Sequence, residues 1–325
     1  MNDELLNILS SVVANATPLV IAGIGETLTE RAGVVNLSLD GSLALSAMVG
    51  FVAALATQNL LVGLLAAMIV GALIALIVAV GAIELRQDQV AVGFVLTLLA
   101  ADVAQFLGQE YTRIPGPTIP YWPLPLLRDV PVVGPIFFDH NWLVYFSYIL
   151  VFVTWYYLFR TRPGLAHRAV GERPESAYAR GTRVQYQRYL WTMVGGALVG
   201  LAGAAYSLSI KPGWATPPVM RGDGWIALAI VIFGGWHPFR VVLGAYLFAG
   251  LRSLSSAIQR DDTIQIPFVL LNALPWALMI ITLLVVSSGA VERLLRIMPR
   301  GVQNRMRNFL RSDPPAALGT TFKGD

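Results

Sequence analysis

The stretch LLVGLLAAMIVGALIALIVAVGAI, residues 60–83, contains no charged or strongly polar side chain. An α-helix needs about 20 mostly apolar residues to cross the hydrocarbon core of a bilayer, and this stretch is longer than that. A helix also satisfies its own backbone hydrogen bonds, which lipid cannot do. Residues 60–83 therefore predict a membrane-spanning helix and point to the fold class of the whole chain.

The composition extends this prediction to all 325 residues. The chain is 56% hydrophobic and 13% charged, with a mean hydropathy of +0.64. Soluble globular proteins carry roughly 25% charged residues, so this chain has too few charges to cover a soluble surface. A soluble enzyme, a disordered chain and a nucleic-acid-binding module are excluded. Cysteine is absent, which excludes a disulfide framework and thiolate chemistry.

Apolar blocks recur along the chain. We expect an all-α polytopic membrane protein with about 8–10 transmembrane helices, some of them short or broken. The blocks lie near residues 5–25, 33–57, 60–83, 90–108, 142–159, 189–210, 224–235, 239–257 and 266–287.

The positive charges between the blocks predict the orientation. Residues 160–188 hold seven Arg against two acids, and residues 293–311 hold six Arg and no acid. Residues 109–140 hold two Arg against three acids. Short segments rich in Arg stay cytoplasmic, so we place 160–188 and the C-terminal tail inside and 109–140 outside. An even number of crossings must then separate the two inner segments, which predicts a tight hairpin at 224–257 with its tip near the cytoplasm and an outer N-terminus.

Polar residues inside the blocks are candidates for a solute path, because charges in a membrane are expensive unless they are paired or meet water. Asn36 and Asp40 would share a helix face, or Gly33 and Gly41 would let the segment unwind into a broken helix that lines a path. Alternatively, Asp40 caps a helix or pairs with Arg31. Asp102 and Gln105 are weaker candidates, since Asp102 near a helix end can meet headgroups. The predicted path residues are Asn36, Asp40, Ser42, Thr97, Asn272 and Trp276.

A small-residue face is expected in the block 189–210. Gly195, Gly196, Gly200 and Gly203 would let neighbouring helix backbones approach closely, which indicates structural packing rather than substrate binding.

The segment 160–188 is expected to form two short helices. Leu165–Val170 fits an amphipathic helix, and Pro174 can begin a second one with Glu175 in its first turn and Gly181 at its end. Such a compact segment indicates a docking surface for a cytoplasmic partner.

Several chemistries lack their motifs. The sequence has no GxxxxGK[ST] loop, no HExxH and no GxSxG, and His140, His167 and His237 do not form a metal set. We therefore expect no catalysis and no metal in this chain. The tail around 292–311 could form an amphipathic helix on the inner leaflet, and residues 312–325 are expected to be disordered.

Three stretches, in order, resemble a known family. GETLTERAGVVNLSLDGSLALSAMVGF (25–51), GLAHRAVGERPESAYARGTRV (164–184) and GWIALAIVIFGGWHPFRVVLGAYLFAG (224–250) resemble the permease subunits of bacterial ABC importers for nucleosides, simple sugars and branched-chain amino acids. The middle stretch resembles their cytoplasmic coupling helix, with Ser176 replacing an Ala of the pattern EAA-x-x-x-G. The nucleoside branch is the nearest, and GWHPFR together with Ser38 and Asp40 departs from the usual pattern.

The resemblance implies a transmembrane permease domain over 1–291, with the coupling loop at 160–188, and a basic, partly disordered cytoplasmic tail over 292–325. It implies import of a small polar solute, most readily a nucleoside, across the bacterial inner membrane. ATP and Mg would bind to partner ATPase subunits, a second permease chain would form a heterodimer, and an extracytoplasmic lipoprotein would deliver the solute. The implied coupling residues are Gly164, Arg168, Gly171, Glu172, Glu175, Ala177 and Gly181.

Other functions stay open at this stage. A simple sugar or a riboflavin-like molecule could be the solute of the same kind of permease. An ion-coupled secondary transporter would use Asp40 and Asp102 for protons or sodium, and an intramembrane enzyme would need a nucleophile or metal set that the sequence does not provide.

Overall fold

The structure is a computed structural model that describes residues 3–259, 273, 276–277, 280–281 and 313–322. Within these residues every regular element is a helix, which confirms the all-α prediction. The elements are α1 (Asp3–Arg31), α2 (Leu39–Thr57), α3 (Leu60–Ile83), α4 (Gln89–Gly108), η1 (Gln109–Tyr111), η2 (Gly134–Phe138), α5 (Trp142–Arg160), α6 (Arg162–Glu172), α7 (Pro174–Ala179), α8 (Val184–Ala205), η3 (Tyr206–Ile210), α9 (Asp223–Phe233) and α10 (Pro238–Ile258).

Seven of the described helices are long and apolar enough to cross a membrane, and α9 is a shorter apolar helix. Together they account for eight of the nine expected blocks. The ninth block, 266–287, lies mostly outside the described residues, as do Asn272 and the Arg-rich stretch 293–311. The chain is therefore a polytopic helical membrane protein.

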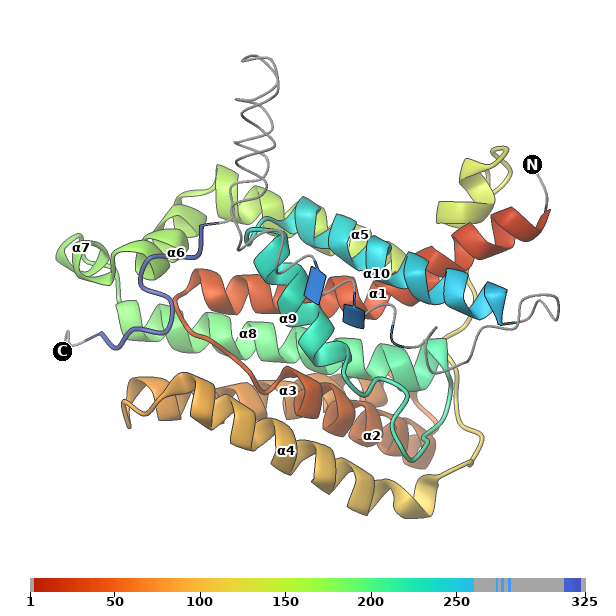
Figure 1. Ribbon diagram of the computed structural model, residues 1–325, viewed down its shortest axis with the longest axis horizontal. Coiled ribbons are helices and arrows are strands. Elements are labelled where there is room, and N and C mark those ends of the chain that lie inside the picture. Colours follow the sequence, from red (N-terminus) through yellow and green to blue (C-terminus); the bar gives the residue numbers. More distant parts are fainter. Residues whose placement is uncertain (1–2, 260–272, 274–275, 278–279, 282–312, 323–325) are drawn as a thin grey trace.

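The helices form layers around a central pair (Figure 1). Helices α1 and α8 run side by side through the middle, with α2, α3 and α4 on one side and α5 and α10 on the other. Helix α9 lies between these groups and contacts α1, α2 and α10. Helix α9 therefore contacts one helix of the central pair and the helix groups on both sides of it.

Glycine backbones hold the centre together, as the small-residue face predicts. A Cβ at Gly195 would meet the carbonyl of Gly25 on α1, and a Cβ at Gly196 would meet that of Gly71 on α3. Gly200 and Gly203 meet the backbones of α3 and α2 in the same way. These contacts leave no room for a side chain, so α8 is fixed against three helices by close approach.

The two ends of the bundle carry different segments. The N-terminal end of α1 and η2 lie at one end, and α6, α7 and residues 313–322 lie at the other (Figure 1). This arrangement agrees with opposite sides for 109–140 and 160–188. Which end faces the cytoplasm stays a prediction.

The predicted hairpin at 224–257 is present as α9 and α10. The chain reverses at Gly235 and Trp236, which have positive φ angles of 59° and 53°. Pro238 then starts α10, where its missing N–H is harmless. The tip lies against the last turn of α1 and not in open lipid.

The expectation of disorder over residues 312–325 is wrong for residues 313–322, which lie along α6. The Ala317 N–H donates to the Gly171 carbonyl at 2.8 Å, and the Gly319 N–H donates to the Gly33 carbonyl at 3.1 Å. Pro315 and Ala317 are buried, and the Phe322 ring lies 5.7 Å from that of Tyr178. We call residues 313–322 the strap. Its anchors are the backbone carbonyls of Gly33 and Gly171 and the side chains of Arg188 and Glu172, all of them distant in the sequence.

Candidate functional site

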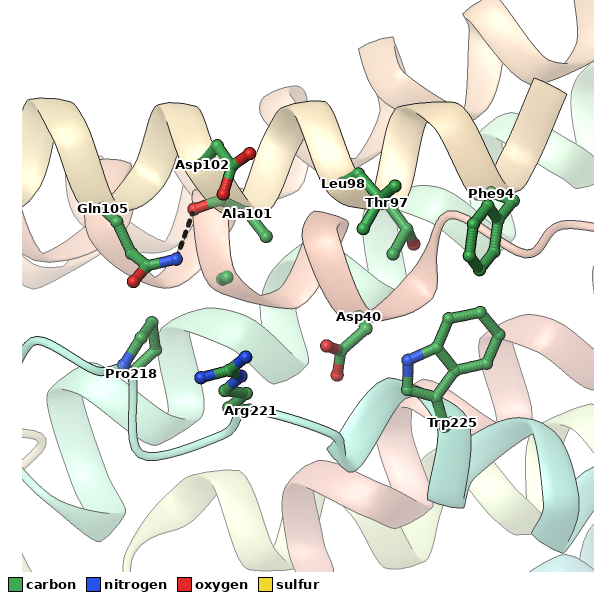
Figure 2. A pocket seen from close by; sticks show the side chains of 11 residues that line it. Asp40, Phe94, Thr97, Leu98, Ala101, Asp102, Gln105, Pro218, Arg221 and Trp225 are labelled. Carbon is green, nitrogen blue, oxygen red and sulfur yellow. Dashed lines mark hydrogen bonds between the residues drawn. The ribbon is translucent and has the colours of Figure 1, made fainter. Parts of the chain in front are cut away.

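A cavity of about 400 Å³ opens between α2, α4 and α9 (Figure 2). Ligand pockets for small molecules typically occupy roughly 300–1,000 Å³. The lining mixes aromatic, acidic, amide and basic side chains: Asp40, Ala44, Phe94, Thr97, Leu98, Ala101, Asp102, Gln105, Pro218, Arg221 and Trp225. Asp40 and Thr97 of the predicted path residues are brought together here.

Asp40 lies in the first turn of α2 and holds the start of α9. Its Oδ1 accepts hydrogen bonds from the N–H groups of Gly222 at 2.8 Å and Gly224 at 3.1 Å. A carboxylate at the N-terminus of a helix satisfies free N–H groups and complements the helix dipole. Of the two interpretations of Asp40, helix capping is therefore present, although the capped helix is α9, which lies 182 positions along the chain. Arg31 contacts Glu172 instead.

Asn36, Ser38 and Ser42 hold the broken segment 32–38 between α1 and α2 and do not line the cavity. Asn36 precedes the helix, and its Oδ1 accepts from the backbone N–H and hydroxyl of Ser38 at 3.1 and 2.6 Å. Ser42 Oγ lies 3.1 Å from Ser38 Oγ. Because these bonds compete with helix formation, α2 begins at Leu39 and not near residue 33. The Thr97 hydroxyl donates to the Leu37 carbonyl at 2.7 Å and ties this segment to α4.

Gly41 has a different role from the one expected. A Cβ at Gly41 would collide with the Thr97 backbone, so Gly41 serves close packing between α2 and α4 and not unwinding. Gly33, with a φ of +89°, makes the turn that ends α1. The two glycines thus give the broken segment 32–38 a fixed shape.

Two aromatic rings in the cavity lining are in tilted contact with each other. The centroids of Phe94 on α4 and Trp225 on α9 are 6.0 Å apart, with the ring planes at 49°. Figure 2 shows the Asp40 carboxylate, the Arg221 guanidinium and the Gln105 amide pointing into the same space. Rings with hydrogen-bonding groups of both kinds beside them suit a planar polar solute.

Sequence reasoning missed Phe94, Trp225 and Arg221. Trp225 stands in an apolar run, and its place in the cavity depends on the Asp40 contact. Trp276, which was predicted, packs on Gly222 at the start of α9. It lies beside the cavity wall and is not among the lining residues.

An ion pair between a fully buried acid and a half-buried Arg at the start of α9 was also missed. Arg252 on α10 forms a bidentate pair with Asp223, which is fully buried, and the Tyr206 hydroxyl donates to Asp223 Oδ2 at 2.5 Å. Each charge is thereby matched inside the bundle, as the low-dielectric surroundings require. The signal that could have found it is an Arg within the apolar block 239–257.

The predicted coupling segment forms α6 and α7 as expected. Gly181 has a φ of +84°, and its N–H donates to the Tyr178 carbonyl at 2.8 Å, which ends α7. Ala177 is buried with Val170 and Val184, whereas Glu175 is exposed. The Arg168 guanidinium lies 5.0 Å from the Phe159 ring. Helix α7 is thus held to the protein by its buried Ala177 and presents Glu175 on its exposed face, where a partner could dock.

Helix α6 sits directly on the last turn of α1. A Cβ at Gly171 would collide with the Arg31 carbonyl, and Gly164 meets the Tyr157 carbonyl in the same way. Glu172 Oε1 lies 3.6 Å from Arg31 Nη1. His167 is fully buried, with Nε2 2.9 Å from the Leu28 carbonyl, and burial lowers the pKa of its imidazole from 6.5 to about 4. His167 is therefore neutral, and Nε2 carries the proton donated to Leu28.

Two acids near the end of α1 face inward and were also missed. Glu26 Oε1 accepts from the Asn36 N–H at 3.3 Å, and Glu30 Oε2 accepts from the Trp236 indole N–H. Both side chains are buried. They join α1 to the broken segment and to the hairpin tip. Among the described residues, no group of three His, Asp or Glu could hold a metal ion.

Comparisons with known proteins agree with this architecture. Over residues 8–287 the chain matches the family described as branched-chain amino acid transport system / permease component. It is 34% identical over 304 residues to the nucleoside ABC transporter permease protein NupC of Lactococcus lactis, covering 89% of this chain and 96% of NupC. It is 37% identical over 275 residues to the guanosine ABC transporter permease protein NupQ of Bacillus subtilis, covering 78% and 84%.

A relative that is named for another solute is about as similar to this chain. The putative glucose ABC transporter permease protein TsgC13 of Haloferax volcanii is 36% identical over 272 residues, covering 81% of this chain and 82% of TsgC13. None of the solved structures matches the chain. The family match spans most of the membrane helices and the α6–α7 segment, so the chain belongs to the family of ABC transporter permease components of the branched-chain amino acid type.

Proposed function

We propose that this permease imports nucleosides and that the cavity between α2, α4 and α9 is part of the path. The observation that carries the proposal is the adjacent, tilted pair Phe94 and Trp225, 6.0 Å apart, beside Asp102, Gln105 and Arg221. The rings offer faces on which a flat base can stack, and the polar groups can bond its edges and the ribose. The names of NupC and NupQ point to the same solute class.

The remaining parts follow from the family. ATPase subunits would dock on α6 and α7 at the cytoplasmic side of the inner membrane and hydrolyse ATP with Mg. The docking residues would be Gly164, Arg168, Gly171, Glu172, Glu175, Ala177 and Gly181. A second permease chain would complete the channel, and an extracytoplasmic lipoprotein would deliver the solute. This chain would carry no catalytic group of its own.

The path would involve the predicted residues in two ways. Asp40 and Thr97 lie in the cavity wall, and Asn36 and Ser42 shape the broken segment behind it. Trp276 supports the start of α9. Asn272 lies outside the described residues, and its role in the path rests on the sequence alone.

The test is uptake by the complete transporter in proteoliposomes. Labelled guanosine and labelled glucose are supplied separately with the cognate binding protein outside and ATP inside. Trp225→Ala should lower guanosine uptake about tenfold, because stacking of a base on an aromatic ring contributes about 1–3 kcal/mol, whereas Trp225→Phe should retain most of it. Phe106→Ala is the matched control, since Phe106 on the same helix as Phe94 is 72% exposed and does not line the cavity.

Three results would contradict the proposal. Uptake of glucose without uptake of guanosine would assign the chain to the sugar permeases, as TsgC13 suggests. Guanosine uptake that is unchanged in Trp225→Ala would remove the cavity from the path. Uptake driven by an ion gradient without any ATPase would instead support the secondary transporter.

A further inference from the structure

We propose that α9 is a rod that carries movement of α6 to the cavity, with Arg31 as its joint at the coupling end and Asp40 as its joint at the cavity end. The inference rests on the proposed function, because it assumes that α6 is where the ATPase acts. It assigns Arg31 and Asp40 as positioning residues that act through α9.

The joint at the coupling end is the Arg31 guanidinium. Its Nε donates to the Trp236 carbonyl at 3.2 Å and its Nη2 to the Gly235 carbonyl at 3.4 Å. Its Nη1 lies 3.6 Å from Glu172 Oε1, at the end of α6. One side chain thus contacts both the coupling helix and the tip of the α9–α10 hairpin. The Glu30 carboxylate receives the Trp236 indole N–H and adds a second attachment at the tip.

Helix α6 cannot shift without moving the end of α1. Gly171 lies on the Arg31 carbonyl with no room for a Cβ. His167 Nε2 bonds the Leu28 carbonyl at 2.9 Å. Two backbone carbonyls of the last turns of α1 are therefore in direct contact with α6, and Arg31 belongs to that turn.

Helix α9 is suited to carry a displacement. It has 11 residues, about 16 Å at 1.5 Å per residue. Most of its side chains are buried between neighbouring helices. Its far end is fixed to α10 by the ion pair of Asp223 and Arg252. The hairpin therefore behaves as one body that is held at both ends by polar contacts.

The joint at the cavity end is the Asp40 carboxylate on the N–H groups of Gly222 and Gly224. Trp225 follows directly on α9, whereas Phe94 lies on α4, which is tied to α2 through Gly41 and Thr97. A Cβ at Gly224 would collide with the Asp40 backbone, so the start of α9 can pivot on α2 but cannot slide along it. A tilt of α9 about this contact would change the position of Trp225 relative to Phe94.

The test uses the complete transporter in proteoliposomes with two separate readouts, ATP hydrolysis and guanosine uptake. Arg31→Gln should leave ATP hydrolysis within about twofold and lower uptake about tenfold, since the ATPase still docks but its movement no longer reaches α9. Arg31→Lys should restore part of the uptake, because it still donates to the hairpin tip. Arg86→Gln, at an exposed site between α3 and α4, is the control and should leave both readouts unchanged.

Two variants of Asp40 test whether its carboxylate acts by holding the start of α9. Asp40→Asn keeps an oxygen that accepts both N–H groups and should retain most of the uptake, whereas Asp40→Ala should lose it. If Asp40→Asn is as impaired as Asp40→Ala, the negative charge itself is needed and the cavity joint is refuted.

A direct measurement covers the case in which Arg31→Gln fails to assemble. The chain has no cysteine, so Leu98→Cys and Arg221→Cys give two unique spin labels across the cavity (Figure 2). The distance between the labels should change when a non-hydrolysable ATP analogue binds. An unchanged distance, or normal uptake in Arg31→Gln, would contradict the proposal that α9 carries movement of α6 to the cavity. Failure of the unmodified transporter to import guanosine overturns the proposed function instead.

Discussion

Protonation of His167 should loosen the contact between α6 and α1 at mildly acidic pH. The imidazole is fully buried, stacks on the Trp191 ring at 4.6 Å and donates to the Leu28 carbonyl. Burial first, and the nearby Arg31 and Arg168 guanidinium groups in addition, lower its pKa from 6.5 to about 4. A proton on His167 would put a third positive charge into this site.

The size of the effect follows from the two pKa values. Between pH 6.5 and about 4 the unfolded chain binds more protons at this residue than the folded chain, so stability is complete above pH 6.5 and falls as the pH is lowered. Lowering the pH from about 7.5 to about 5.5 should remove about 1.4 kcal/mol, since a pKa difference is worth about 1.36 kcal/mol per unit. Below the folded pKa the loss stops.

The assay compares the wild-type chain with His167→Gln in detergent micelles, unfolded by added SDS at the two pH values. Glutamine can still donate to the Leu28 carbonyl but does not titrate. The lost stacking on Trp191 lowers stability equally at both pH values and cancels in the comparison. We expect the stability advantage of the wild type to shrink by about 1.4 kcal/mol at the lower pH. An advantage that is the same at both values would refute the argument from burial.

Further predictions follow from the packing, the strap and the topology. Gly200→Leu should prevent stable assembly, because a Cβ there collides with the Ala67 carbonyl. Gly250→Leu, whose Cβ would meet only Val12 Cγ1 at an ordinary 4.0 Å, should fold and elute normally in size-exclusion chromatography. Deleting residues 313–325 should increase the rate of proteolytic cleavage in α6 several-fold. Equal cleavage rates for the full and shortened chains would argue against the strap contacts. Fusions of a reporter that is active only outside the membrane should be active at residue 125 and silent at 175, and activity at 175 would overturn the orientation.

The membrane helices could be predicted from sequence because lipid imposes a simple rule on them. A span must be apolar over about 20 residues, so its ends follow from where polar residues begin. The α6–α7 segment was equally accessible, since Pro163, Pro174 and Gly181 punctuate it through backbone effects that are local. In both cases the deciding interaction lies within a few residues of the element that it determines.

The cavity and the strap could not be predicted because their deciding contacts join distant parts of the chain. Asp40 was recognised as unusual, but its partners at Gly222 and Gly224 lie more than 180 positions away. The strap depends on the backbone carbonyls of Gly33 and Gly171, and a backbone atom leaves no mark in composition. In the sequence, Trp225 is one apolar residue in an apolar run, and only the position of α9 in the fold places it at the cavity.

The kinds of contact around each helix separate a fixed part of the bundle from a part that can move. Helix α8 meets α1 and α3 through glycine backbones, where any shift either opens a void or causes a collision, so these helices have one arrangement. Helix α9 meets a backbone in this way in its first turn, where Gly224 packs on Asp40, and is otherwise held by Asp40, Asp223 and Arg31 through hydrogen bonds and ion pairs. Such polar contacts can be exchanged for others when a neighbour moves, and several discrete pairings of one hairpin are what a gate requires. In a membrane each of these charges carries a cost of several kcal/mol unless it is matched. Their concentration around one short helix fits the proposed movement of that helix.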